Sequence, residues 1–214
     1  MKYKLVIFDL DGTILNTLED LYISVNFALL KNNLPQRSRE EVRRFVGNGI
    51  RLLIERAVPE KTESELTEKV FFDFKEHYAV HSMDNTKPYE GIKDLLTDLK
   101  RQGVKTAVVS NKADFAVQKL VSLYFDGMFD FVLGEMEGTN KKPAPDMVYK
   151  AIEAVDVSAE YVVYIGDSEV DVETADNSSV DCIIVDWGFR EREYLLSCGA
   201  KVLASCVSEL SELL

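Results

Sequence analysis

The sequence contains little cysteine and histidine and no long hydrophobic run. Its three cysteines, Cys182, Cys198 and Cys206, form neither an even set for disulfides nor a closely spaced pair of metal ligands. No apolar run is long enough to cross a bilayer, and the N-terminus lacks the pattern of a signal peptide. We therefore expect a cytoplasmic protein with reduced thiols and no membrane partner.

Positive charge is also scarce. The 25 Lys and Arg residues are outnumbered by 37 Asp and Glu residues, which gives a formal net charge of -12. Such an excess of negative charge disfavours binding to a nucleic-acid backbone or to an anionic membrane. Hydrophobic residues make up 46% of the chain, an ordinary share for a globular protein. The composition therefore argues against a nucleic-acid partner and is compatible with a metal-dependent enzyme.

Short apolar segments alternate with helical patterns over most of the chain. The strand-like segments are Lys4–Asp9, Lys105–Ser110, Phe131–Leu133, Tyr161–Gly166 and Cys182–Val185, with Lys201–Leu203 at the edge. Helical patterns fall at Gly91–Arg101, Ala113–Leu123, Asp146–Val155 and Val170–Ala175. This alternation predicts an α/β fold, a Rossmann-like parallel sheet with helices on both faces.

The segment between the first two strands breaks the alternation. Residues 16–84 contain no convincing strand and predict helices at Leu18–Lys31, Arg39–Phe45, Ile50–Ala57 and Thr62–Val80. Ser38 with Glu41, and Thr62 with Glu65, have the spacing of capping boxes. The insertion is too long for a crossover connection. We expect an inserted α-helical cap domain at 16–84, acting as a lid, on a core formed by 1–15 and 85–214.

The first strand ends in the polar run Asp9-Leu10-Asp11-Gly12-Thr13. In open α/β sheets, ligands bind just beyond the carboxyl ends of the strands. Asp9 and Asp11 would repel each other unless a cation lay between them, and oxygen ligands of this kind favour Mg²⁺. Gly12 permits a sharp turn that brings backbone N–H groups close to an anion. The alternative is a plain turn, since Asp, Gly and Thr are common turn residues.

Other polar residues follow the second strand and precede a later helix. Ser110 and Asn111 could bind phosphate oxygens, or one of them could be the N-cap of the next helix. Pro143 restricts Lys142 to extended conformations, which favours Lys142 over Lys141 as a fixed ammonium group that neutralises a phosphate. An exposed loop lysine is the alternative.

The fourth strand also ends in acidic residues. Asp167 stands at the strand end, where it could complete a metal site with Asp9 and Asp11. Asp171 lies on the first turn of the next helix, and we expect it to hold a metal-bound water or to orient Lys142. Favourable charge at a helix N-terminus is the alternative explanation for these acids.

Together, these motifs resemble those of the haloacid dehalogenase-like hydrolase superfamily. Asp9–Thr13 resembles its first motif, Ser110 the second, Lys142 the third, and Gly166-Asp167 with Asp171 the fourth. The helical insertion is similar in position to the small helical cap of the family. Val46–Gly49 and Trp187–Arg190 are similar to the phosphoglycolate phosphatase subgroup, and the resemblance spans nearly the whole chain.

The resemblance implies a mechanism and a cofactor. Asp9 would attack phosphorus to form an aspartyl-phosphate, and Asp11 would act as general acid and then as general base. Mg²⁺ would be held by Asp9, Asp167 and the backbone carbonyl of Asp11. The residues implied to bind the phosphoryl group are Gly12, Thr13, Ser110, Asn111 and Lys142.

The resemblance also narrows the range of expected activities. Dehalogenase and phosphonatase relatives lack an aspartate at the position of Asp11, and phosphoglucomutase relatives carry a histidine where this chain has Leu18–Tyr22. The prediction is a phosphatase acting on a small phosphorylated metabolite such as 2-phosphoglycolate. The alternatives are a pyrophosphatase or 5′-nucleotidase on the same core, and a phosphate-binding regulatory protein. The oligomeric state, monomer or homodimer, stays open.

Within the insertion, Gly47, Asn48 and Gly49 form a glycine-rich turn that precedes Arg51. If the insertion closes over the active site, this turn and Arg51 could contact an anionic leaving group. A plain helix–helix turn is the alternative.

Two smaller features carry predictions of their own. His77 and His81 have the i,i+4 spacing of a metal-binding pair, but a solvated helix face is the expected environment because no third ligand is evident nearby. Asp176–Val180 replaces the glycine-containing segment usual in the family, which predicts an altered, less stable helix C-cap.

Overall fold

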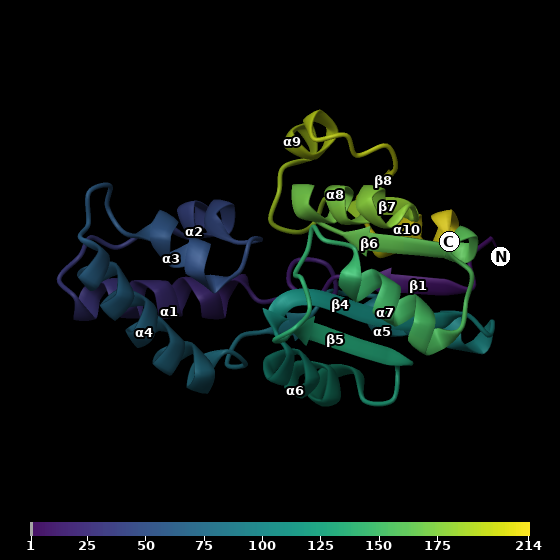
Figure 1. Cartoon of the computed structure of the whole chain (residues 1–214), viewed down its shortest axis with the longest axis horizontal. Coiled ribbons are helices and arrows are strands. Elements are labelled where there is room, and N and C mark those ends of the chain that lie inside the picture. The colour runs from purple at the N-terminus through teal and green to yellow at the C-terminus, as the bar shows by residue number, and fades with distance from the viewer. Residues whose placement is uncertain (1) are drawn as a thin grey trace. The chain divides into compact units, whose positions relative to one another are not determined.

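The computed structural model describes residues 2–214, which divide into two compact units. One unit comprises the chain up to Leu15 and Pro88–Leu214, and the other is Asn16–Lys87. The first contains the parallel sheet and the second is helical (Figure 1). No helix within residues 2–214 is long and apolar enough to span a membrane.

The first unit is built on a six-stranded sheet with the order β5-β4-β1-β6-β7-β8. All its strand pairs are parallel, which confirms the predicted α/β class. The bounds are β1 Leu5–Phe8, β4 Lys105–Ala113, β5 Phe131–Glu135, β6 Val162–Gly166, β7 Asp181–Val185 and β8 Leu203–Ala204. Phe8 aligns with Val108 of β4 and Ile165 of β6, so β1 and β6 end side by side while β4 continues to Ala113.

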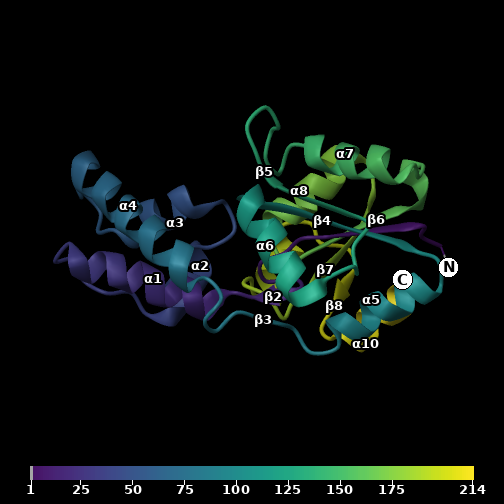
Figure 2. The same cartoon turned by 90° about the horizontal axis from the view of Figure 1, so that it is seen from below.

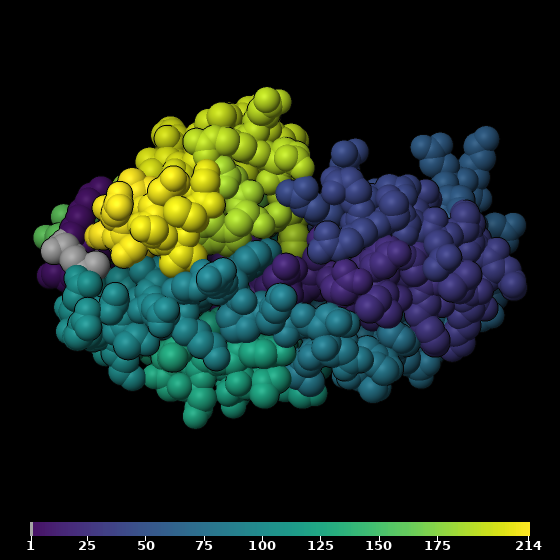
Figure 3. Space-filling model, turned by 180° about the vertical axis from the view of Figure 1, so that it is seen from behind, coloured from purple at the N-terminus to yellow at the C-terminus, as the bar shows by residue number. Residues whose placement is uncertain are grey.

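Helices cover both faces of this sheet, as predicted. They are α5 Ile92–Arg101, α6 Asp114–Phe125, α7 Asp146–Val155, α8 Glu169–Ser178, α9 Arg192–Ser197 and α10 Val207–Leu213, with a 3₁₀ turn at Ala159–Tyr161. Figure 2 shows α7 and α8 on one face and α5 and α10 on the other. In Figure 3 the C-terminal residues, in yellow, adjoin the teal surface around α5, which α10 contacts. Every residue of β1 is fully buried, because both of its faces are covered.

The start of α6 corrects one alternative drawn from the sequence. Strand β4 continues to Ala113 and α6 begins at Asp114, so neither Ser110 nor Asn111 is the N-cap. The pairing of β4 with β5 shifts register between Val109 and Ala113, which places Ser110 in an irregular stretch at the end of the strand. The Asp114 carboxylate accepts a 2.8 Å hydrogen bond from the Gly134 N–H and fixes the helix start there.

The second unit contains α1 Leu18–Lys31, α2 Arg39–Phe45, α3 Ile50–Ala57 and α4 Ser64–His81. The capping box at Ser38 and Glu41 is present. The one predicted at Thr62 and Glu65 is wrong, because α4 begins at Ser64 and the Thr62 hydroxyl donates to the Pro59 carbonyl instead. Two short strands not predicted from the sequence, β2 Leu15–Asn16 and β3 Lys87–Pro88, pair with each other.

A buried aspartate forms hydrogen bonds that connect the first turn of α1 to the end of this unit. Asp20 is 2% exposed and accepts hydrogen bonds from the backbone N–H groups of Asn85 and Thr86 and from both of their side chains. Several donors on one carboxylate offset the cost of burying its charge. Asp20 therefore fixes the position at which the chain leaves the helical unit.

Both histidines lie on α4, and His77 contacts two residues of α1. The half-buried His77 ring stacks on Phe27 with centroids 4.1 Å apart, and its Nδ1 lies 3.0 Å from Ser24 Oγ. The expected solvated face is therefore wrong for His77. His81 pairs with Asp84 at 2.7 Å, and within residues 2–214 neither histidine belongs to a group of three candidate metal ligands.

The end of α8 has the altered cap expected from the sequence. Ser179 adopts the left-handed conformation, with φ 55° and ψ 40°, in the position where glycine is usual. The Val180 N–H then bonds to the Ala175 carbonyl at 3.2 Å. A residue with a Cβ is strained at this φ.

We expect Ser179→Gly to raise the free energy of unfolding by about 0.5–1 kcal/mol, since relief of left-handed strain exceeds the added entropy of the unfolded chain. Chemical denaturation at fixed pH measures it. Glu173→Gly, on the exposed side of the same helix, is the matched control and should cost about 1 kcal/mol. Destabilisation by both substitutions would contradict the strained-cap account.

Candidate active site

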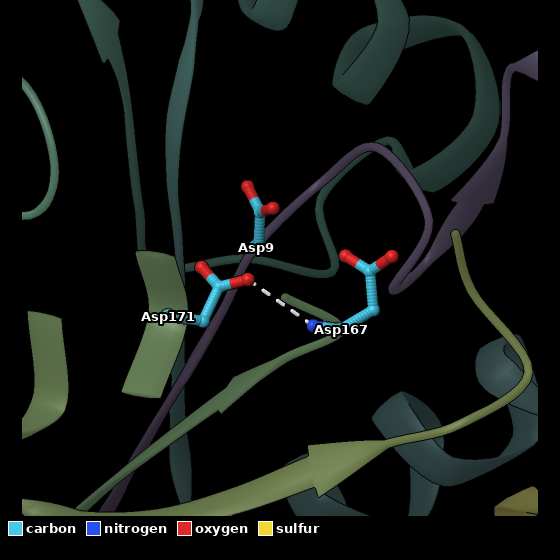
Figure 4. Close-up of side chains that lie close together, drawn as sticks. All are labelled: Asp9, Asp167 and Asp171. Atoms are coloured by element: carbon cyan, nitrogen blue, oxygen red, sulfur yellow. Dashed lines mark hydrogen bonds between the residues drawn. The ribbon is translucent and has the colours of Figure 1, made fainter. Parts of the chain in front are cut away.

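Three buried carboxylates meet at the carboxyl ends of β1 and β6. Asp9 directly follows β1, Asp167 directly follows β6, and Asp171 lies on the first turn of α8 (Figure 4). One oxygen from each lies within 4.8 Å of the others. The neighbouring positions of β1 and β6 in the sheet bring together residues that are far apart in the sequence.

Lys142 is the cation at the centre of this group. Its Nζ lies 2.9 Å from Asp9 Oδ1, 2.8 Å from Asp171 Oδ1 and 3.0 Å from the Tyr164 hydroxyl. The side chain is 3% exposed, so the alternative of an exposed loop lysine is wrong. Burial alone would lower the pKa of this ammonium, but Asp171 and Asp9 beside it raise the pKa well above its ordinary value.

The backbone of Lys142 is held by the side chain of Asn111. The Asn111 amide donates to the Lys142 carbonyl at 3.0 Å and accepts from the Lys142 N–H at 2.8 Å. Asn111 therefore positions Lys142 from the end of β4. The peptide bond between Lys142 and Pro143 is cis. Ser110 is 2% exposed, and its Oγ accepts from the Lys112 N–H at 3.3 Å.

Asp171 uses both of its oxygens within the protein. Oδ1 contacts Lys142 Nζ and accepts from the Tyr164 hydroxyl at 3.1 Å. Oδ2 accepts from the Ser168 hydroxyl at 2.6 Å and from the backbone N–H groups of Ser168 and Asp167 at 3.1 and 3.2 Å. Of the two roles expected from the sequence, this geometry favours the orientation of Lys142.

Asp167 is enclosed by backbone. Its Oδ2 accepts from the Phe189 N–H at 2.7 Å, and its Oδ1 lies 3.4 Å from the Thr13 hydroxyl. Gly12, at φ +86°, and Gly188 lie so close that a Cβ on either would collide with the Asp167 carboxylate. These glycines allow the chain to close around the acid.

The turn after Asp9 uses its polar groups internally. The Gly12 N–H donates to the Leu15 carbonyl at 2.9 Å, and the fully buried Thr13 hydroxyl faces Asp167. These donors shape the turn and hold a carboxylate. The phosphate contacts expected from Gly12 and Thr13 stay predictions.

Asp11 lies beside the cluster and forms an ion pair with a different cation, Lys112. Lys112 Nζ is 3.0 Å from both Asp11 oxygens. The Lys112 side chain is 7% exposed and the Asp11 side chain 19% exposed. The Asp11 carboxylate is not one of the three grouped as candidate metal ligands, so a metal contact from Asp11 would have to come from its backbone carbonyl, as the family resemblance implies.

The cluster carries an excess of buried negative charge. Burial raises the pKa of Asp9 to about 6; Lys142 opposes this shift, and Asp171 and Asp11 add to it. Burial also raises the pKa of Asp167 well above its usual range, with further contributions from Asp171 and Asp9. Carboxylates that repel one another in a buried site fit a divalent cation, whose charge would offset both effects.

The glycine-rich turn belongs to the helical unit. Gly47 and Gly49 have φ values of 122° and 89°, and α3 begins at the next residue, Ile50. Arg51 forms a two-pronged ion pair with Glu68, and its guanidinium lies 4.1 Å above the Phe71 ring. Arg51 thus has partners within its own unit, and its contact with substrate, like those of the Gly47-Asn48-Gly49 turn, stays a prediction.

Comparison with known proteins places the fold and these motifs in one family. The model of the haloacid dehalogenase-like hydrolases matches residues 6–185. The chain belongs to this family. A phosphoglycolate phosphatase of Aquifex aeolicus is 30% identical over 187 residues, which cover 87% of this chain and 86% of the relative. One from Haemophilus influenzae is 33% identical over 197 residues, with 88% of each chain covered.

A solved structure extends the similarity to the whole chain of this hydrolase. The protein comes from Lactobacillus delbrueckii subsp. bulgaricus, and its own assignment as a phosphoglycolate phosphatase is an inference. It has 39% sequence identity and a TM-score of 0.95, and the alignment covers 100% of this chain and 98% of that one. The predicted family and fold are confirmed.

Sequence reasoning missed three contacts at this site. The sequence pattern predicts Tyr164 only as a strand residue, but a buried tyrosine hydroxyl needs a polar partner, and this need is a signal of the site. The contact of Lys112 with Asp11 and that of the Phe189 N–H with Asp167 depend on the course of the chain, and no local pattern encodes them.

The raised pKa of Asp9 makes the metal-free protein depend on pH in a defined way. Between about pH 4 and 6 the folded state binds a proton at Asp9 that the unfolded state has lost, so this group's contribution to stability falls as pH rises. We expect the free energy of unfolding of the wild type, relative to Asp9→Asn, to fall by up to about 3 kcal/mol from pH 4 to pH 7. Denaturation in the presence of a chelator measures this difference, and a flat difference would contradict the burial of a raised-pKa carboxyl.

Proposed function

We propose that this hydrolase is a Mg²⁺-dependent phosphatase that cleaves small phosphomonoesters, with 2-phosphoglycolate as its substrate. The observation that carries the proposal is the buried Asp9 carboxylate, paired with Lys142 at 2.9 Å and followed two residues later by a second aspartate, Asp11. The named relatives from Aquifex and Haemophilus support the choice of 2-phosphoglycolate. The helical unit is proposed to be the cap that selects this substrate.

Asp9 would be the nucleophile. A pKa of about 6 leaves its carboxylate largely ionised at neutral pH, as attack on phosphorus requires. The ion pair with Lys142 fixes one oxygen, and β1 fixes the backbone. The attack forms an aspartyl-phosphate and breaks the bond to the ester oxygen. The Lys142 ammonium would bind a phosphoryl oxygen and offset the charge that develops on it, together with the Ser110 hydroxyl.

Asp11 would be the general acid and the general base. It would donate a proton to the leaving ester oxygen and then take one from the water that hydrolyses the aspartyl-phosphate. Different surroundings suit the two aspartates to different roles. The Asp9 side chain is 12% exposed and touches the buried Lys142, whereas that of Asp11 is 19% exposed and pairs with Lys112.

The cation would be Mg²⁺, held by Asp9, Asp167 and the carbonyl of Asp11. Asp171 lies in the same cluster, but its oxygens are engaged by Lys142, Tyr164 and Ser168, which leaves it to position Lys142. When bound, Mg²⁺ neutralises phosphoryl oxygens and orients the phosphoryl group for attack.

The activity is tested by phosphate release from 2-phosphoglycolate, pyrophosphate, nucleoside monophosphates and sugar phosphates in the presence of Mg²⁺. We expect the highest kcat/KM for 2-phosphoglycolate and a loss of at least about a thousandfold in Asp9→Asn, because the nucleophile is removed. Asp94→Asn, on the exposed side of α5, is the control that should keep full activity. Preference for pyrophosphate or a nucleotide would overturn the substrate, and unchanged turnover in Asp9→Asn would overturn the covalent mechanism.

The metal site is tested without activity. Mg²⁺ at a hundred times its Kd should stabilise the wild type by about 2.7 kcal/mol, because it binds only the folded state. Asp167→Asn should abolish most of this gain, since one buried ligand is lost. Thermal unfolding with and without Mg²⁺ measures the effect. An equal gain in both proteins would contradict the assignment of Asp167.

A further inference from the structure

In the mechanism described above, the ion pair between Lys112 and Asp11 only distinguishes the surroundings of Asp11 from those of Asp9, and Lys112 itself has no role in binding substrate. Lys112 Nζ lies 3.0 Å from each oxygen of Asp11, so it holds the carboxylate symmetrically. The Lys112 side chain is 7% exposed, and an ion pair shielded in this way is worth more than an exposed surface pair. The pair occupies both oxygens of the residue that has to reach the ester oxygen of the substrate.

Lys112 lies close to the expected position of the leaving group. A general acid has to lie about 3 Å from the atom that it protonates. If Asp11 contacts the ester oxygen, Lys112 Nζ lies no more than about two hydrogen-bond lengths, roughly 6 Å, from that oxygen. This places Lys112 within reach of the part of the substrate that leaves.

The other buried cations at these strand ends have different partners. Lys142 contacts Asp9, Asp171 and Tyr164 on the phosphoryl side. Arg190 pairs with Glu169 at 2.8 and 3.2 Å. Lys112 contacts both oxygens of Asp11. Lys112 is thus placed to recognise charge on the leaving group.

We propose that Lys112 determines specificity for phosphate esters that carry a carboxylate next to the ester carbon. The substrate carboxylate takes the place of the Asp11 carboxylate at the Lys112 ammonium. The exchange frees Asp11 to turn to the ester oxygen. An ester without that negative charge leaves the Lys112–Asp11 pair intact and is a poorer substrate.

The geometry of such a substrate fits the exchange. In 2-phosphoglycolate the carboxylate oxygens lie about 3 Å from the ester oxygen, because two carbon atoms separate them. This distance spans the first half of the path of roughly 6 Å from the ester oxygen to Lys112 Nζ, and a hydrogen bond of about 3 Å spans the rest. The inference rests on the proposed phosphatase function and adds the residue that distinguishes a carboxylate-bearing ester from a neutral one.

The test compares two substrates of nearly equal shape, 2-phosphoglycolate and its neutral amide, phosphoglycolamide. The measured quantity is the ratio of their kcat/KM values with Mg²⁺ present. We expect the wild type to prefer 2-phosphoglycolate by at least about tenfold. Lys112→Met should reduce this ratio at least about tenfold, because the variant loses an ion pair to the substrate worth about 1.4 kcal/mol or more. Lys112→Arg should retain most of the preference, because the charge is kept.

Lys119→Met is the matched control. Lys119 is an exposed lysine on α6, and its loss removes the same unit charge without touching Asp11. The substrate ratio of this variant should equal that of the wild type. If it falls as in Lys112→Met, net charge rather than the Lys112 contact sets the preference, and the proposal is overturned.

The remaining outcomes are also decisive. Equal losses on both substrates in Lys112→Met would make Lys112 a positioning residue for Asp11 alone and would overturn the proposal. A wild-type ratio near one would also overturn the proposal, even if Lys112→Met failed to fold. Hydrolysis of neither ester by the wild type, with Mg²⁺ binding intact, would refute the proposed phosphatase function itself, and the inference would fall with it.

Discussion

The buried contact between Lys142 and its two aspartates is the interaction on which the rest of the site depends. An ammonium with a 3% exposed side chain is tolerable only because Asp9 and Asp171 lie within 2.9 Å of it. Removing either acid would leave an incompletely paired charge in the interior, and removing Lys142 would leave three mutually repelling carboxylates. The parallel sheet satisfies this constraint by placing β1 beside β6, so that their ends deliver Asp9 and Asp167 to the same edge, with Asp171 just beyond.

Much of the fold could be predicted from the sequence, because local patterns encode it. Helices α1, α2, α3 and α7 have the predicted bounds, since their apolar spacing and end residues agree. Short elements failed for the opposite reason. The paired strands β2 and β3 are each two residues long, too few to establish a period. Helices α9 and α10 have six and seven residues and, unlike the equally short α2, no capping box marks their start. Thr62 had capping spacing, but the helix began two residues later.

The site was predictable in composition but not in its contacts. A motif names Asp9, Asp11, Lys142 and Asp167 because residue type and spacing are local properties. Which polar groups are already engaged is decided by the folded chain. Asn111 could be predicted as a polar strand-end residue, but its hydrogen bonds to the Lys142 backbone arise only when the loop before α7 returns to β4. Lys112 reaches Asp11 in the same way, across a sequence separation of 101 residues.

Tyr164 belongs to two parts of the molecule at once. Its ring packs in the cluster that includes Met147 and Val148 of α7, while its hydroxyl contacts Lys142 and Asp171. The packing between the sheet and α7 therefore sets the position of the Tyr164 hydroxyl, and with it the position of the Lys142 ammonium. Repacking this interior for heat resistance would therefore move the Lys142 ammonium without changing any polar residue.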